Sequence, residues 1–180
     1  MAKQKTGNLN PNIPSPELAR LMTVAASKME AYKLNLLTPQ LLLRVFIEEA
    51  CSAHQILQQL QQDRGFDWGD FSRRIEMMAR HSPGRDANFL FTDDFGKQIK
   101  LADELLIGID EALTIAQARD ELKISSAHLL AAMATQQVTT FAVLQRVGIT
   151  SAAVTAKLET VVQDGGTIIR DYVDEAKKAV

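Results

Sequence analysis

Histidine and cysteine are the residue types in this chain best suited to catalysis or metal binding, and there are few of them. Cys51 and His54 lie three positions apart, so on a helix both could face one metal ion. A structural zinc site needs four ligands, and no second Cys/His pair accompanies these two residues. We therefore predict no metal site, and we interpret Cys51 as a small apolar residue at a helix junction. His128 has no nucleophile or acid beside it in the sequence, so we predict a partly buried histidine that hydrogen-bonds between helices.

Paired carboxylates occur at Glu48-Glu49, Asp93-Asp94 and Asp103-Glu104. Adjacent residues on a helix point about 100° apart, so these pairs do not converge for acid–base catalysis. ATP chemistry needs a phosphate loop, and no Gly-x-x-x-x-Gly-Lys-Ser/Thr motif occurs in the chain. The sequence therefore predicts a protein without catalytic residues, without a cofactor and without ATP binding.

The composition excludes several classes of partner. The chain has 180 residues and a formal net charge of −2, so it offers no basic footprint for nucleic acid or anionic lipid. Its one cysteine allows no intramolecular disulfide and fits a reducing cytoplasm. No apolar run approaches the roughly 18 residues that span a bilayer, and the polar N-terminus lacks the apolar run of a signal peptide. We expect a cytoplasmic protein that contacts neither nucleic acid nor membrane.

Apolar residues recur with helical spacing along nearly the whole chain after Ser15. Ser15-Pro16-Glu17 carries the residue types favoured at a helix start, and Thr38-Pro39 repeats this signal. No sustained alternation and no Asn-Gly or Asp-Gly turn indicates a hairpin. We therefore predict an all-α chain whose first helix ends near Lys33 and whose helicity resumes around Phe95 after a linker.

The second half of the chain repeats the plan of the first half. When the sequence is moved along itself by 87 positions, residues 37–43 (LTPQLLL) fall on residues 124–130 (ISSAHLL). An apolar residue, a hydroxyl cap and a leucine pair thus recur in one register. One four-helix unit of this size has little core, so two units stacked about a pseudo-twofold axis would bury their apolar stripes together. We expect Leu42 and Leu129 both to be buried.

These patterns predict the following domain organisation. Residues 1–14 form a flexible lead-in, and residues 15–164 form one globule of two four-helix repeats. Repeat 1 covers residues 15–81, a linker covers 82–94, and repeat 2 covers 95–164. Gly165-Gly166 then opens a hinge and an amphipathic linker helix over residues 165–180.

The stretch Ile124–Leu130 resembles the signature of the Clp N-terminal repeat, in which an apolar residue and a small or hydroxyl pair lead into Glu-His-Leu-Leu. Val143–Ile149 resembles the leucine-glycine end of the same repeat, whereas in the first half Leu41 stands where the histidine would be. The resemblance covers residues 15–164 and implies the double Clp repeat domain of Clp/Hsp100 AAA+ unfoldases. It implies a non-catalytic module at the mouth of a ring-shaped ATPase, which receives protein substrates or adaptor proteins.

The resemblance also implies a partner-binding site at the start of the second helix of each repeat. Relatives that recognise phosphorylated arginine carry an acidic residue before the signature histidine, where this chain has Gln40 and Ala127. We therefore expect Pro39, Gln40, Ser126 and Ala127 to bind partners through apolar and neutral polar contacts. We expect these residues to be symmetry-related and at least partly solvent-exposed, and we expect phosphoarginine to bind weakly or not at all.

Three functions remain open at this point. The first is the substrate- or adaptor-binding N-terminal domain of a Clp-type ATPase subunit. The second is a free-standing accessory subunit that docks on a Clp protease assembly and regulates it. In both cases AAA+ modules, of the same chain or of a partner chain, would lie alongside this domain. The third is an unrelated helical enzyme, which turnover abolished by replacing His128 would support.

Overall fold

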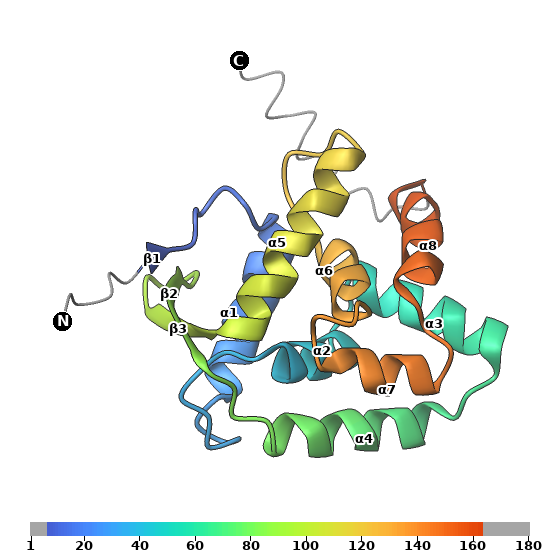
Figure 1. Cartoon of the computed structure of the whole chain (residues 1–180), viewed down its shortest axis with the longest axis horizontal. Helices are drawn as coiled ribbons and strands as arrows, with labels where there is room; N and C mark the ends of the chain where they lie inside the picture. Colours follow the sequence, from blue (N-terminus) through green and yellow to red (C-terminus); the bar gives the residue numbers. More distant parts are fainter. Residues whose placement is uncertain (1–6, 164–180) are drawn as a thin grey trace.

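The computed structural model describes residues 7–163, which form eight helices and three short strands (Figure 1). Repeat 1 contains α1 (Pro16–Lys28), α2 (Pro39–Glu48), α3 (Ser52–Arg64) and α4 (Trp68–Arg80). Repeat 2 contains α5 (Asp103–Ala118), α6 (Ser126–Met133), α7 (Thr140–Arg146) and α8 (Ser151–Gln163). The strands are β1 (Gly7–Asn8), β2 (Asp86–Thr92) and β3 (Gln98–Ala102). The predicted helical fold class is confirmed, and the predicted hinge and helix over 165–180 lie outside the described residues.

The internal repeat places equivalent helix starts 87 positions apart. Helices α1 and α5 begin at positions 16 and 103, and α2 and α6 begin at 39 and 126. The hydroxyls of Thr38 and Ser125 each accept a hydrogen bond from the backbone N–H three residues on, at 3.1 and 3.2 Å. Such caps satisfy N–H groups that have no partner within the helix. Leu42 and Leu129 are both fully buried, as the repeat predicts.

Two backbone bridges join the repeats in a reciprocal way. Pro14, just before repeat 1, pairs with Ile124 of repeat 2, and Leu101 of repeat 2 pairs with Leu37 of repeat 1. These two bridges are equivalent under the same offset of 87 positions. Four backbone hydrogen bonds of 2.8, 2.9, 3.0 and 2.8 Å form them. The bridges therefore have the symmetry expected of a pseudo-twofold axis between the repeats.

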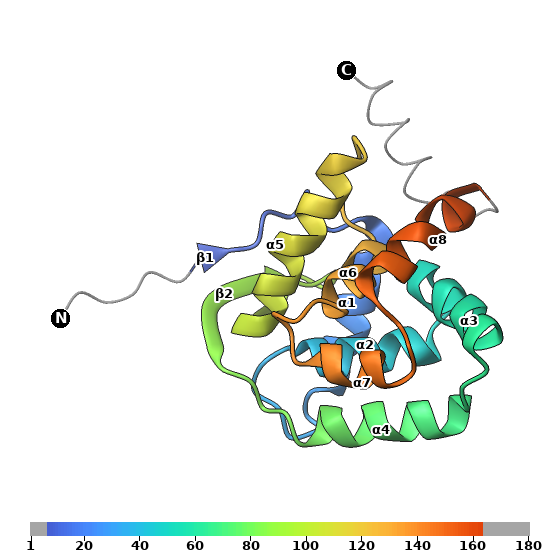
Figure 2. The same cartoon turned by 45° about the vertical axis from the view of Figure 1, so that its right-hand side comes forward.

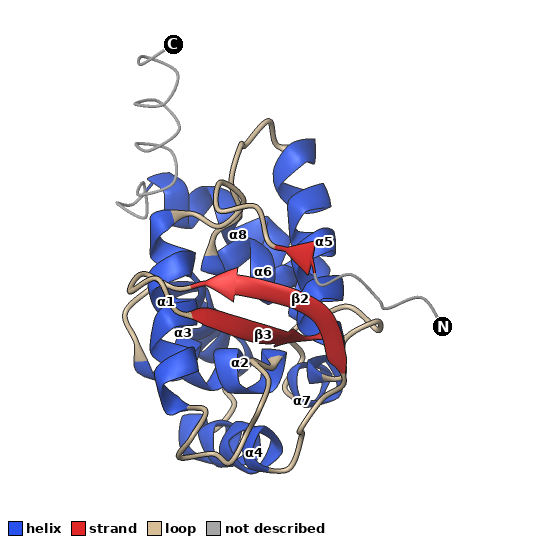
Figure 3. Ribbon diagram, turned by 90° about the vertical axis from the view of Figure 1, so that its left-hand side faces the viewer, coloured by secondary structure: helices blue, strands red, loops and turns tan. Residues whose placement is uncertain are grey.

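A small three-stranded sheet is present, contrary to the all-α expectation from the sequence. Its order is β1-β2-β3, with β1 parallel and β3 antiparallel to β2 (Figure 3). The expected linker over 82–94 thus contains β2, and the helix expected from Phe95 begins only at Asp103. Within the expected flexible lead-in, Leu9 is buried and donates its backbone N–H to Leu90 O at 2.8 Å. These parts of the prediction were wrong because β1, β2 and β3 stabilise one another through pairing between distant segments.

Helix α1 ends at Lys28, earlier than the predicted end near Lys33. Lys33 has a left-handed backbone conformation with φ 58°, and its counterpart 87 positions on, Asp120, has φ 59°. In both repeats the next residue donates its N–H back to a carbonyl at the end of the helix, from Leu34 to Met29 and from Glu121 to Ala116, at 2.9 Å. A left-handed residue of this kind satisfies the last carbonyls of a helix and turns the chain sharply.

Helices α2 and α6 lie in the middle of the molecule, with α4 and α7 below α2 in the view of Figure 1 and again in Figure 2. Every residue of α6 is buried, and eight of the ten residues of α2 are buried. The core therefore sits where the second helices of the two repeats meet. Within residues 7–163, no helix is long and apolar enough to cross a membrane.

Candidate partner-binding site

The four residues predicted to bind partners are all buried. Pro39 and Gln40 lie in the first turn of α2, and Ser126 and Ala127 lie in the first turn of α6. Gln40 is 4% exposed, Ser126 is fully buried and Ala127 is 2% exposed. The expectation that these helix starts are partly open to solvent is therefore wrong. The physical reason is that α1, α2 and α3 of repeat 1 all contact α6, so the helix starts face the other repeat and not the solvent.

The carboxylate of Glu17 joins the two repeats at the start of α6. Its Oε1 accepts the backbone N–H of Ser126 at 3.0 Å. Its Oε2 accepts the backbone N–H and the hydroxyl of Ser52, each at 2.7 Å. Glu17 is 6% exposed, so one buried negative charge caps the positive ends of both α3 and α6. From its place in the sequence, Glu17 is predicted only to be a favourable residue at the start of α1.

Glu104 is the counterpart of Glu17 in repeat 2, 87 positions later. Its Oε2 accepts the hydroxyl of Thr139 at 2.8 Å and lies 3.4 Å from Gln40 Nε2. Gln40 Nε2 also donates to Thr139 Oγ1 at 2.5 Å. Pro39 stands where repeat 2 has Ser126, and proline has no backbone N–H to donate. A side-chain amide therefore replaces the backbone donor at this end, and Glu104 is only half-buried.

Glu104 and Gln40 line an open cavity of about 420 Å³. Its other lining residues are Met78, Ser82, Gly84, Arg85, Asp103 and Thr139. Among the described residues none donates a hydrogen bond to Glu104 Oε1. The cavity thus combines two carboxylates, an amide, two hydroxyls, one guanidinium and a thioether, which suits recognition of a polar or cationic side chain. Of the four predicted residues, Gln40 alone reaches this cavity.

His128 is held inside the protein and not in a cleft. It is 1% exposed, and its Nδ1 accepts the backbone N–H of Ser125 at 2.9 Å. That hydrogen bond leaves the ring proton on Nε2, which lies 3.1 Å from Glu121 Oε2. Both of these atoms are buried and have no other partner among the described residues. Burial opposes ionisation of Glu121, but His128 and the nearby Arg119 together hold its pKa below the usual 4.5. The histidine completes the cap of α6 and links it to the end of α5.

Cys51 and His54 make local structural contacts. Cys51 is the N-cap residue of α3, and its Sγ accepts the backbone N–H of His54 at 3.4 Å. His54 Nδ1 lies 3.0 Å from the carbonyl oxygen of Phe46. Burial raises the pKa of the Cys51 thiol to about 11, which disfavours the reactive thiolate. Over residues 7–163, no group of three His, Cys, Asp or Glu side chains is placed to hold a metal ion.

No protein-family model and no curated protein matches this sequence. Among solved structures, the Hsp104 N-terminal domain from Candida albicans superimposes with a TM-score of 0.60 at 16% identity, covering 86% of this chain and 93% of that chain. The N-terminal domain of the ClpV1 ATPase from the E. coli EAEC Sci1 T6SS superimposes with a TM-score of 0.58 at 17% identity, covering 79% and 81%. This chain has the Clp N-terminal domain fold. The resemblance found in the sequence is confirmed for the fold, because the Clp N-terminal domain structures span most of this chain.

Proposed function

We propose that this chain is a substrate- or adaptor-binding N-terminal domain of a Clp-type ATPase, and that it does no chemistry of its own. The observation that carries the proposal is the half-open cavity between the two Clp repeats. Gln40 reaches it from α2 of repeat 1, and Glu104 and Thr139 reach it from repeat 2. A binding surface built by both repeats depends on the intact double-repeat fold, which supports a role for the whole domain.

The chemistry of the cavity supports recognition of a basic side chain. Asp103 and Glu104 lie side by side at the start of α5, and Arg85 is the one cationic side chain lining the cavity. The hydrogen bonds from Thr139 and Gln40 fix Glu104 Oε2 in place and leave Oε1 to accept from a ligand. A carboxylate held in this way loses little freedom when it binds an ammonium or guanidinium group.

The test is a titration of the isotope-labelled domain with an unfolded model protein, reduced and carboxamidomethylated lactalbumin, monitored by amide chemical shifts. Shifts should concentrate at Gln40, Asp103 and Thr139. Glu104→Gln should weaken binding, whereas Asp110→Asn, on the exposed side of the same helix, should not. Binding that is equally strong in both variants would contradict the assignment of this cavity. No binding of any unfolded protein or adaptor would contradict the proposed function itself.

A further inference from the structure

Strand β3 has an outer edge that the protein's own backbone occupies only at one end. β3 is the outermost strand in the order β1-β2-β3. Leu37 donates its N–H to Lys100 O at 2.8 Å and accepts the N–H of Ala102 at 3.0 Å. Upstream of Leu37 the chain leaves β3, because the left-handed Lys33 turns it toward the end of α1. The outer edge of β3 is therefore open from the N–H of Lys100 back to Gln98.

The backbone groups at this open edge can be identified from the pairing with β2. Asp93 N donates to Lys97 O at 2.8 Å, so the backbone of Lys97 faces β2. Backbone groups alternate in direction along a strand, so those of Gln98 and Lys100 face away from β2. The bond from Leu37 to Lys100 O confirms this alternation. Gln98 N–H, Gln98 C=O and Lys100 N–H thus point outward, and no described residue bonds to them.

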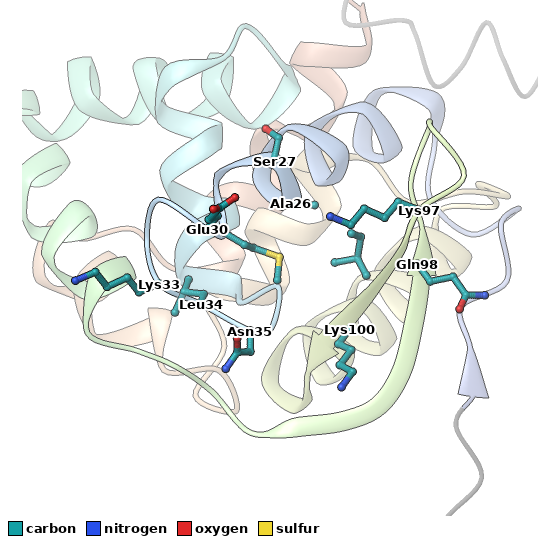
Figure 4. A pocket seen from close by; sticks show the side chains of 11 residues that line it. Ala26, Ser27, Glu30, Lys33, Leu34, Asn35, Lys97, Gln98 and Lys100 are labelled. Atoms are coloured by element: carbon teal, nitrogen blue, oxygen red, sulfur yellow. The ribbon is translucent and has the colours of Figure 1, made fainter.

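A groove of about 680 Å³ lies along the open edge (Figure 4). Leu34 and Ile99 are its buried apolar residues. Figure 4 shows Lys97 extending across the groove toward Ala26 of α1. The full lining is Ala26, Ser27, Met29, Glu30, Lys33, Leu34, Asn35, Lys97, Gln98, Ile99 and Lys100. Three lysines against one glutamate make the rim positively charged in a protein whose net charge is −2.

The pseudo-symmetric edge in repeat 1 is closed by its sequence. Pro11 and Pro14 stand 87 positions before Gln98 and Leu101. Proline donates no backbone hydrogen bond, and it is a common way to block the edge of a sheet. Lys123 also donates its Nζ to Asn12 O at 2.6 Å on that side. The fold therefore tolerates a blocked strand edge at this position in repeat 1. The equivalent edge in repeat 2, the outer edge of β3, is nevertheless free from Gln98 to the N–H of Lys100.

The hairpin that carries β3 is fastened to α1. Asp94 donates its N–H to Thr23 Oγ1 at 3.1 Å, and Thr23 donates to Ala19 O at 2.8 Å. Phe95, at the hairpin tip, is 87% exposed. It lines a smaller cavity of about 210 Å³ that shares Lys97 and Ile99 with the groove. The edge is thus held at a fixed distance from α1, with an apolar surface at its upstream end.

We propose that β3 binds an extended, acidic peptide segment of a partner protein by strand addition. The segment bonds to the backbone of Gln98 and Lys100, and its alternate carboxylates lie on the face of the added strand that is next to Lys97. Strand addition supplies affinity through the backbone and specificity through alternate side chains. This surface is separate from the Gln40–Glu104 cavity, so the two sites can be tested independently.

The probe is the fluorescein-labelled peptide Thr-Val-Asp-Val-Asp-Val-Thr, with fluorescence anisotropy as the readout. We expect saturable binding that weakens with added salt. The same peptide with lysine in place of aspartate should bind at least about tenfold more weakly. A version methylated on alternate backbone nitrogens should not bind. When peptide is bound, hydrogen exchange should slow at the amides of Gln98 and Lys100. Exchange at the amide of Ile99, which already faces β2, should change little.

Matched variants distinguish peptide binding in the groove from a general effect of the protein's charge. Lys97→Glu should weaken binding about tenfold, whereas Arg73→Glu, the same charge reversal on an exposed part of α4, should leave it unchanged. Glu104→Gln should also leave it unchanged. No binding at about 1 mM peptide, or equal binding of the lysine peptide, would overturn the proposal, and the lysines would then only protect the edge against pairing. Protection of the same amides by self-association, seen in sedimentation without peptide, would overturn it in favour of a second copy of this chain.

Discussion

Replacing Glu17 tests whether its carboxylate holds the two repeats together. In Glu17→Gln one oxygen is kept and the other becomes an amide that cannot accept a hydrogen bond. Either Ser126 N–H or the Ser52 pair then loses its acceptor inside the protein. Bonds to a charged acceptor contribute about 1.5–3 kcal/mol each, and an unsatisfied buried donor costs about 1–3 kcal/mol. We expect Glu17→Gln to lower the free energy of unfolding by about 2–4 kcal/mol, out of a total of roughly 5–15 kcal/mol.

Urea unfolding followed by far-ultraviolet circular dichroism measures this loss, and Glu104→Gln is the matched control. Glu104 is half-buried and accepts from a hydroxyl and a side-chain amide, which can turn toward water or toward the new amide. Its replacement should cost less than about 1 kcal/mol. Equal losses in the two variants, or a loss below about 0.5 kcal/mol for Glu17→Gln, would refute the role assigned to Glu17.

Three further predictions concern pH, thiol reactivity and ligand choice. The pKa of Glu121 lies below 4.5 in the folded protein. The ionised carboxylate therefore stabilises the fold above about pH 4.5, and this stabilisation is lost as the pH falls through the folded pKa. Glu121→Gln should make the free energy of unfolding less dependent on pH in the acid range, and an unchanged dependence would contradict this. Because burial raises the pKa of Cys51 to about 11, iodoacetamide at about pH 8 should label the thiol only after unfolding, and rapid labelling of the native protein would count against its burial. Calorimetry should detect no binding of free phosphoarginine, and Gln40→Glu should not create it because that buried carboxylate would face Glu104; tight binding by the unchanged protein would show that this ligand class was wrongly excluded.

The helical repeat was predictable because its signals are local. Thr38 and Ser125 are cap residues followed by leucine pairs, and each feature acts within one turn of helix. The burial of Leu42 and Leu129 then follows from helical period alone. Local signals of this kind predict helices without any knowledge of how distant parts of the chain pack.

The sheet and the site depended on contacts between distant residues. Gln98-Ile99-Lys100-Leu101 does alternate between exposed and buried residues, but the run is short and leads directly into α5. Phe89, Leu90 and Phe91 are consecutive apolar residues, so β2 shows no alternation at all. The burial of Pro39 and Ser126 is set by how the repeats stack. Similarly, the role of Glu17 rests on partners in α3 and α6 that its own neighbours in the sequence do not reveal.

The two backbone bridges between the repeats have a consequence for how the domain holds together. The segment before α1 is completed by repeat 2, and the segment before α5 is completed by repeat 1. A short extended arm of each half therefore pairs with the other half, as exchanged segments do in a domain-swapped dimer. The covalent link between the halves passes through Ser82 and Pro83, outside both arms. Cutting the chain there would leave every bond of the two bridges in place, so two separate fragments could reassemble into one body, whereas either fragment alone would lack the arm that closes it.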